Sequence, residues 1–254
     1  MAVRVHVLGC GDAFGSGGRA QTCLLVEALG RRVLIDCGAT ALVSMRRFGV
    51  APESVEAVAL THLHGDHFAG LPFLLLYARH VAGHPSGVHI AGPRGVRART
   101  LAAFDALYEG AGQSIAALSG EGAPARFEEY RASVPFGLGP ATVTAVPVVH
   151  SEKSECFGVR LEVEDRVVAY SGDTAWTGAL LDLASGADLF IVECQAWAGP
   201  PPGHLAFDEL RRHLPALDAR RILLTHMGEP MLARAPEIAG DRVLVAQDGM
   251  VLEL

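Results

Sequence analysis

The chain has 254 residues, of which 50% are hydrophobic and 19% are charged, and this composition excludes a disordered or fibrous protein. Its net charge of −7 at pH 7 disfavours a surface that grips nucleic acid over a wide area. The apolar runs are far shorter than the roughly 18 to 20 residues of a membrane-spanning helix, and the first residues do not resemble a secretion signal, so a cytoplasmic protein without a membrane partner is expected.

Apolar and polar residues alternate from Val3 to Leu8, and a glycine-rich turn follows from Gly9 to Gly18. Two short β-like runs around Gly30 then predict a hairpin. The elements predicted up to residue 124 are strands at Val3–Leu8, Cys23–Ala28, Arg32–Asp36, Val55–Leu60 and Gly87–Ala91, helices at Ala41–Phe48, Leu71–Arg79 and Arg94–Tyr108, and a loop with a short helical piece at Gly110–Pro124.

The second half repeats the order of strands followed by a helix. The predicted strands are Arg126–Arg131, Thr142–Val149, Phe157–Val163, Arg166–Tyr170, Leu189–Val192 and Arg221–Leu224, with a helix at Phe207–His213 and a closing hairpin formed by Val243–Ala246 and Met250–Leu254. No repeat or long linker divides the chain, so residues 1–254 are expected to form one domain. Strands and helices in this order predict two sheets face to face with helices outside.

A cluster of possible metal ligands follows the predicted strand Val55–Leu60. His62, His64, Asp66 and His67 lie within six residues, and packing alone does not explain three imidazoles and a carboxylate in one short loop. Alternate residues of an extended segment point the same way, so His62 and His64 can bind one cation. After a turn at Gly65, Asp66 and His67 can bind a second, which predicts two adjacent metal sites.

Three further candidate ligands come directly after β-like runs: His150, Asp173 and His226. A carboxylate has two oxygens, so Asp173 can bridge both ions, with His150 on the first and His226 on the second. The predicted sets are His62, His64, His150 and Asp173 on one metal, and Asp66, His67, Asp173 and His226 on the other.

The motif Thr61-His-Leu-His-Gly-Asp-His67 resembles the His-x-His-x-Asp-His signature of the metallo-β-lactamase superfamily. Four other segments are similar, more narrowly, to its ribonuclease Z-like branch: Leu8–Gly11, Leu34–Gly38, Ser171–Thr174 and Gln247–Met250. The resemblance runs from residue 3 to the C-terminus. It implies an α/β fold, a four-layer αβ/βα sandwich with a dinuclear site at the edge of the sheets.

The resemblance also implies roles for residues around the metals. His204 stands where this branch has the histidine that protonates the leaving group, although a surface histidine is the alternative. Glu193 could orient it, or be an ordinary carboxylate at a strand end. Asp66 would both bind metal and orient or deprotonate the bridging water. Two cations would lower the pKa of that water and neutralise charge in an in-line displacement, which suits phosphodiester hydrolysis.

Departures from the tRNA-processing members favour a smaller substrate. Only 22 residues separate His150 from Asp173, where those ribonucleases carry a long arm for tRNA, and the segment Met227–Met231 lacks their usual continuation. The prediction is therefore a hydrolase of a small phosphodiester, cyclic ones included. The alternatives are tRNA 3′ processing without the arm, with RNA as partner, thioester or lactam hydrolysis, and a non-catalytic metal-binding protein.

Imidazole and carboxylate ligands suit two zinc ions by default, and manganese or iron as well. Family resemblance implies a homodimer. The five cysteines form no Cys-x-x-Cys pair and are expected to be reduced and buried. Specificity is expected to reside in the loop Gly11–Gly18 and the segment Gly110–Pro124.

Overall fold

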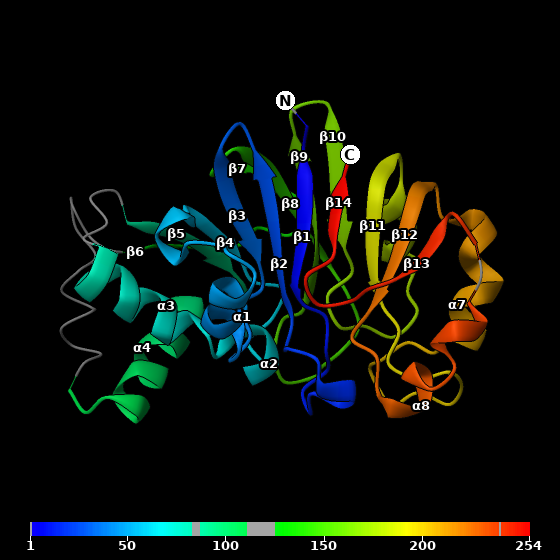
Figure 1. The fold of residues 1–254 in the computed structure, drawn as a ribbon, viewed down its shortest axis with the longest axis horizontal. Helices are drawn as coiled ribbons and strands as arrows, with labels where there is room; N and C mark the ends of the chain where they lie inside the picture. The colour runs from blue at the N-terminus through cyan, green and yellow to red at the C-terminus, as the bar shows by residue number, and fades with distance from the viewer. Residues whose placement is uncertain (1, 83–86, 111–124, 239) are drawn as a thin grey trace.

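Two seven-stranded mixed sheets pack face to face, and helices cover the outer face of each (Figure 1). The computed structural model describes residues 2–82, 87–110, 125–238 and 240–254. The strand order is β14-β1-β2-β3-β4-β5-β6 in the first sheet and β13-β12-β11-β10-β9-β8-β7 in the second. This is the predicted α/β sandwich of four layers.

The first sheet and its helices are formed by residues 4–129 and by the last strand. Their bounds are β1 Arg4–Gly9, β2 Cys23–Ala28, β3 Arg31–Ile35, α1 Ala41–Arg47, β4 Ala57–Ala59, α2 Gly65–Phe68, α3 Leu71–Tyr77, β5 Val88–Gly92, α4 Val96–Leu107, β6 Ala125–Glu129 and β14 Val251–Glu253.

The second sheet and its helices are formed by residues 136–245. Their bounds are β7 Phe136–Leu138, β8 Ala141–Pro147, β9 Phe157–Val163, β10 Arg166–Tyr170, α6 Ala179–Ala184, β11 Ala187–Glu193, α7 Phe207–His213, β12 Ala219–Thr225, α8 Glu229–Leu232 and β13 Val243–Val245. Short helical turns add η1 Ser16–Gly18, η2 Pro52–Ser54, η3 Ala78–Ala82, η4 Leu214–Ala216 and η5 Ala235–Glu237.

Side-chain alternation along the strands builds three layers of core. In β11, Leu189 and Ile191 face the other sheet, whereas Phe190 and Val192 pack under the helices of the second sheet. A strand buried on both faces reads as a continuous apolar run, because its two faces pack against different layers. The same division separates the core between the sheets from that under α1, α3 and α4.

The N-terminal hairpin is confirmed, since β2 and β3 pair in antiparallel register from Leu24 with Ile35 to Ala28 with Arg31. The prediction of a closing hairpin is wrong. β13 pairs in parallel with β12 in the second sheet, and β14 pairs antiparallel with β1 in the first. The intervening turn is held to the N-terminal loop, where Asp248 accepts hydrogen bonds from the backbone N–H groups of Cys10 and Ala20, at 3.0 and 2.7 Å. Local alternation identified both strands but not their partners.

Four short elements, α2, β7, α6 and α8, were not predicted. Each has three to six residues, too few for a periodic signal. The predicted helix at Leu71–Arg79 ends as α3 at Tyr77 and continues into the π-helical turn η3. The loop predicted at Gly110–Pro124 lies, except for Gly110, outside the described residues.

The two chain ends lie at one edge of the sandwich, and α2 and α8 lie at the opposite edge (Figure 1). Within the described part of the chain, no helix combines the length and apolar character needed to cross a bilayer. The edge that carries α2 and α8 receives the loops with the predicted metal ligands.

Candidate metal centre

Four loops bring the predicted ligands to this edge. The loop after β4 carries His62 and His64, and the helix that follows it, α2, begins at Gly65 and carries Asp66 and His67. The other three ligands follow separate strands of the second sheet: His150 after β8, Asp173 after β10 and His226 after β12. The structure thus brings all seven side chains together from segments up to 164 residues apart.

The first group consists of His62, His64 and His150, whose ligand atoms lie within 4.8 Å of one another. His64 Nδ1 and His150 Nε2 are 3.1 Å apart. Asp173 Oδ2 lies 3.9 Å from His62 Nε2 and 3.9 Å from His150 Nε2. Asp173 therefore lies beside two of the three imidazoles of this group.

The second group is fully buried and consists of Asp66, His67, Asp173 and His226, again within 4.8 Å. Asp173 Oδ1 lies 3.2 Å from His67 Nε2, and Asp173 Oδ2 lies 3.3 Å from His226 Nε2. Asp66 Oδ2 lies 3.1 Å from His226 Nε2 and 3.3 Å from His67 Nε2. Asp173 thus lies between the two groups, within 4 Å of residues in each.

Unsatisfied atoms at the centre fit a cation. Among the described residues, His62 Nε2, His67 Nε2 and Asp173 Oδ1 are buried without a hydrogen-bond partner, although His67 Nε2 and Asp173 Oδ1 lie 3.2 Å apart. Leaving buried polar atoms unpaired is unfavourable. Nitrogen and carboxylate oxygen donors in this number and spacing suit divalent metal ions.

Asp36 supports the cluster from behind and is a residue that sequence reasoning did not single out. It is fully buried, and its Oδ2 accepts hydrogen bonds from His67 Nδ1 at 2.7 Å and from Thr61 Oγ1 at 2.8 Å. The Thr61 oxygen lies 3.1 Å from His62 Nδ1. One carboxylate therefore orients two imidazoles and leaves their Nε2 atoms free for a metal. The sequence feature that could have identified Asp36 is its position directly after an apolar strand, in the segment Leu34–Gly38.

His150 is oriented by the backbone. Its Nδ1 donates a hydrogen bond to the carbonyl oxygen of Gly203 at 2.9 Å, so its Nε2 is the unprotonated atom when the ring is neutral. Gly203 has φ +82°, and a Cβ there would clash with the His150 carbonyl. A glycine at this position lets the loop that carries His204 approach His150 closely.

His204 and Glu193 form a hydrogen-bonded pair beside the cluster. His204 Nδ1 lies 3.0 Å from Glu193 Oε1, and the His204 ring centre lies 4.8 Å from that of His150. Glu193 is fully buried and also accepts hydrogen bonds from the backbone N–H groups of Thr174 and Leu205, at 2.6 and 3.2 Å. This network fixes the carboxylate and directs Nε2 of His204 away from it.

Burial and charge shift the ionisation of these groups in opposite directions. Burial lowers the pKa of His204, but the hydrogen bond and negative charge of Glu193 outweigh it and raise that pKa above its ordinary value. Burial lowers the pKa of His62 well below its ordinary value, and the nearby His67 adds to this effect. Burial opposes ionisation of Asp173, yet His226 and His67 hold the pKa of Asp173 well below its usual range. Burial also lowers the pKa values of His67 and His226, but the negative charge of Asp173 outweighs it and raises both above the ordinary value. Cations held by the second group would therefore displace protons from these two imidazoles.

The cluster opens on a cavity of about 300 Å³, at the small end for ligand pockets. Its lining residues are Asp12, Ala13, Phe14, His64, Asp66, His150, Asp173, Gln195, Pro201, His204 and His226. The loop Gly11–Gly18, where specificity was expected, supplies three of them. The expected contribution of Gly110–Pro124 falls, except for Gly110, outside the described residues.

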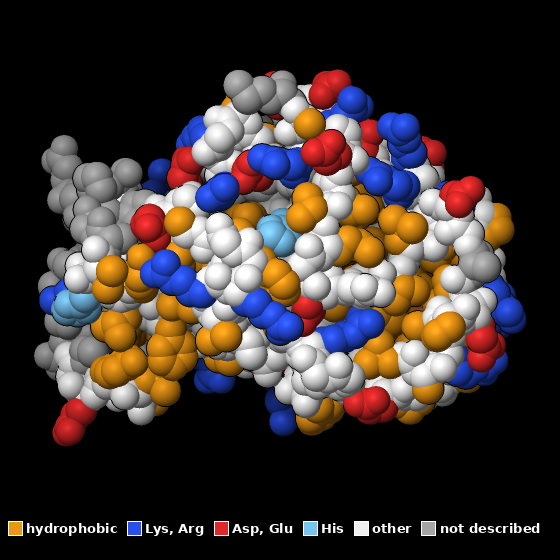
Figure 2. Space-filling view, in the orientation of Figure 1, with side chains coloured by type: hydrophobic (Ala, Val, Ile, Leu, Met, Phe, Trp, Pro, Cys, Tyr) orange, Lys and Arg blue, Asp and Glu red, His pale blue; other side chains and the backbone are white. Residues whose placement is uncertain are grey.

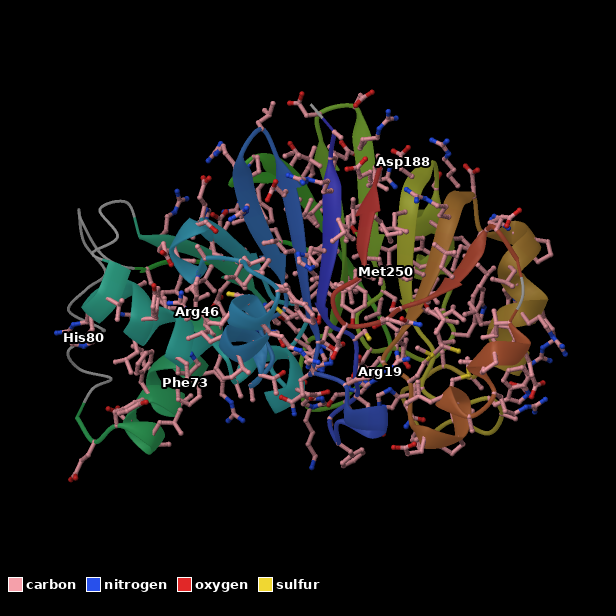
Figure 3. All side chains as sticks on the ribbon, in the orientation of Figure 1. Arg19, Arg46, Phe73, His80, Asp188 and Met250 are labelled. Atoms are coloured by element: carbon pink, nitrogen blue, oxygen red, sulfur yellow. The ribbon has the colours of Figure 1, made fainter. Side chains whose placement is uncertain are left out.

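Hydrogen bonds join the N-terminal loop to the C-terminal turn. Arg19 donates a hydrogen bond from Nη1 to the carbonyl oxygen of Ala246 at 2.6 Å, and Arg19 lies below Met250 in Figure 3. His226 is also held to the N-terminal loop, because its backbone N–H donates a hydrogen bond to the Cys10 carbonyl oxygen at 3.0 Å. His226 has φ +57°, a left-handed conformation that is uncommon outside glycine and recurs at functional sites.

Comparison with known proteins agrees with this geometry. The family model described as "Anti-Pycsar protein Apyc1" matches residues 3–251. A ribonuclease Z of Haloferax volcanii is 28% identical over 305 aligned residues, which cover 100% of this chain and 96% of the relative. The metallo-β-lactamase fold protein YhfI from Bacillus subtilis is 24% identical with a TM-score of 0.78, covering 100% of both chains. A diphosphatase from the PhnP family is 20% identical with a TM-score of 0.80, covering 100% of this chain and 98% of that one.

Proposed function

The chain belongs to the Anti-Pycsar protein Apyc1 family and is a metal-dependent hydrolase of the metallo-β-lactamase fold, and from this premise we propose that it hydrolyses a small phosphodiester. Among small phosphodiesters, we favour a cyclic one as the substrate. The observation that carries the proposal is the joint presence, around one small cavity, of two groups of candidate ligands, of Asp173 within 4 Å of residues in both, and of the His204–Glu193 pair.

Two divalent cations, zinc by preference and manganese or iron as alternatives, would be held by the two groups. The first would use His62, His64, His150 and Asp173, and the second Asp66, His67, Asp173 and His226. When bound, the cations would supply Lewis acidity that activates water and neutralises charge on the phosphoryl group. Asp66, at the wall of the cavity, would orient the attacking water and accept its proton.

His204 would donate a proton to the departing oxygen. Its pKa is raised by the neighbouring Glu193, so the ring is protonated to a higher pH than an ordinary histidine. Glu193 is a positioning residue in this scheme, because its contact with Nδ1 leaves Nε2 to face the cavity. An alkoxide is a poor leaving group, and protonation by a positioned acid accelerates its departure.

Two features of the molecule support a small substrate. Strands β9 and β10 and the turn between them occupy most of the interval from His150 to Asp173, so this interval contains no long arm for tRNA. On the face shown in Figure 2, basic side chains are divided by acidic and apolar ones. Such a surface, with a net charge of −7, suits a small anion better than a long polyanion.

We also propose that the chain acts as one hydrolase domain spanning 1–254, in the cytoplasm and as a homodimer. The five cysteines are all free and buried, which fits a reducing compartment. Light scattering on the purified protein tests the dimer, and a mass of one chain would contradict it.

The test of function is hydrolysis by protein loaded in turn with zinc and with manganese. The substrates are bis(p-nitrophenyl) phosphate, a set of cyclic nucleotides, a precursor tRNA and a thioester, with Asp173→Asn as the control variant. We expect turnover of the small phosphodiesters that Asp173→Asn abolishes. Cleavage of the precursor tRNA alone would favour the ribonuclease Z alternative, and cleavage of the thioester alone an acyl hydrolase. Inertness toward all four would indicate a non-catalytic metal-binding protein.

A further inference from the structure

Phe14 is a large apolar side chain that stands in solvent at the wall of the metal cavity. Its side chain is 88% exposed, the most exposed of the large hydrophobic residues described. It lines the same cavity as His64, Asp66 and His204. Moving an aromatic ring out of water is favourable. An apolar part of a bound ligand could therefore bind against Phe14 at this place.

The backbone that carries Phe14 is held rigidly. Asp12 is buried, and its Oδ1 accepts hydrogen bonds from the backbone N–H of Phe14 at 3.1 Å and of Ser16 at 3.0 Å. Its Oδ2 accepts a third from Ser16 Oγ at 2.7 Å. The carbonyl of Ala13 accepts a hydrogen bond from Gln21 Nε2 at 3.2 Å. The exposed ring therefore projects from a fixed turn.

A second hydrogen bond links this turn to α8, which follows the candidate ligand His226. Gly17 donates its backbone N–H to Glu229 Oε1 at 2.7 Å, and Glu229 begins α8, three residues after His226. The turn lies between α2 and α8 at the lower edge of the sandwich (Figure 1). Both helices adjoin metal-ligand candidates, so the distance from Phe14 to the cluster is set by the fold.

We propose that Phe14 is a specificity-determining residue that stacks on a planar aromatic ring of the substrate, the base of a nucleotide, while the phosphodiester lies against the metal cluster. This inference rests on the proposed function and narrows its substrate class. The cavity has a floor of histidine and carboxylate and a wall that includes the apolar Ala13, Phe14 and Pro201. That division matches a ligand with an anionic end and a flat, weakly polar end.

Stacking recognises the face of a base and not its hydrogen-bonding edge, so it is tolerant of base identity. The proposal therefore predicts that purine and pyrimidine substrates both depend on Phe14. A cyclic phosphate without a base would be hydrolysed at the same cluster but would gain nothing from this residue.

The experiment compares Phe14→Ala and Phe14→Trp with the wild type on three probes: cyclic AMP, cyclic UMP and the base-free methyl riboside cyclic phosphate. Phe73→Ala is the matched control, because Phe73 is an aromatic residue of α3 that packs on Tyr108 and is not among the residues that line the cavity. We expect Phe14→Ala to raise KM for both nucleotides by about 5- to 150-fold, with a much smaller change in kcat. KM for the base-free probe should stay constant, and Phe14→Trp should restore the wild-type values.

Three results would overturn the inference. If Phe14→Ala raised KM equally for the base-free and the base-containing probes, Phe14 would be a structural residue of the turn. If KM and kcat were unchanged on all three probes, Phe14 would have no role in substrate binding. A dimeric wild type that becomes monomeric in Phe14→Ala, with KM unaffected, would assign the ring to a subunit contact. In each of these cases the wild type still hydrolyses phosphodiesters, so the proposed function stands. A wild type inert on all three probes would instead reject the proposed function and the inference with it.

Discussion

At the scale of single residues, the centre depends on side chains that orient the metal-ligand candidates as well as on those candidates themselves. Asp36 is the clearest case, because one buried carboxylate contacts His67 directly and His62 through Thr61. It has φ +58°, a left-handed conformation that asparagine also tolerates. Asparagine can therefore replace it without added backbone strain, and the substitution removes the charge and exchanges one of the two acceptor oxygens for an amide NH2 group.

We expect Asp36→Asn to weaken metal affinity by about 10- to 100-fold, as is typical when a partner of a ligating histidine is removed. Competition with a chromogenic chelator measures this affinity. Asp165→Asn is the matched control, since the side chain of Asp165 is 80% exposed and lies 3.6 Å from Arg166. Equal metal affinity in Asp36→Asn and wild type would show that Asp36 does not tune the cluster.

A second prediction at this scale concerns His204, whose proposed role is to protonate the leaving oxygen. We expect His204→Ala to lower kcat on a cyclic nucleotide by about 10²- to 10⁴-fold. The loss on bis(p-nitrophenyl) phosphate should be much smaller, because nitrophenolate leaves as a stable anion without protonation. Glu193→Gln should show the same pattern to a lesser degree, with the metal content unchanged in both variants. Equal losses on the two substrates would argue that His204 acts in binding or folding and not as an acid.

At the scale of elements, close backbone approach decides where α2 presents Asp66 and His67. Gly70 lies between α2 and α3, and a Cβ there would clash with the carbonyl oxygens of Gly38 and Cys37. Its own φ of −77° is ordinary, so the cost of a side chain would come from contact alone. The loop after β3 and the turn after α2 are packed as one unit through this glycine.

We expect Gly70→Ala to lower Tm by about 2 to 12 °C, since overpacking costs about 1 to 3 kcal/mol in a protein of this size. Gly137→Ala in β7 is the matched control, because a Cβ there would meet no described atom within 4 Å. Differential scanning fluorimetry measures both variants. A Tm for Gly70→Ala equal to that of Gly137→Ala would mean that the loop and α2 move apart at little cost.

At the scale of the whole molecule, metal binding is expected to stabilise the fold, because the candidate ligands come from both sheets. A metal at 100 times its Kd adds about 2.7 kcal/mol to the free energy of unfolding for each site. Chelation should therefore lower Tm by roughly 5 to 11 °C for each site emptied. Stoichiometric zinc should restore it, whereas Asp173→Asn should respond much less. A Tm unchanged after metal removal, verified by elemental analysis, would contradict this coupling.

Much of the fold was predictable because strands buried on two faces and glycine turns leave a local signal. The four strands between Arg126 and Tyr170 and the helix Phe207–His213 appear where periodicity places them, within one or two residues for most of their ends. The short β7, α6 and α8 give no such signal. The partners of β13 and β14 could not be predicted either, since alternation defines a strand's faces and says nothing about its neighbour.

By itself, the sequence determined the residue types of the candidate ligands, their spacing and their order, because His62 to His67 fall within six residues and the other candidates follow strands. Only the tertiary structure decided that Asp173 stands between the two groups, that Asp36 orients His62 and His67, and that Phe14 stays exposed beside them. The residue type alone decides which chemical groups a position offers. The distances between groups that are far apart in the chain depend on how the two sheets pack.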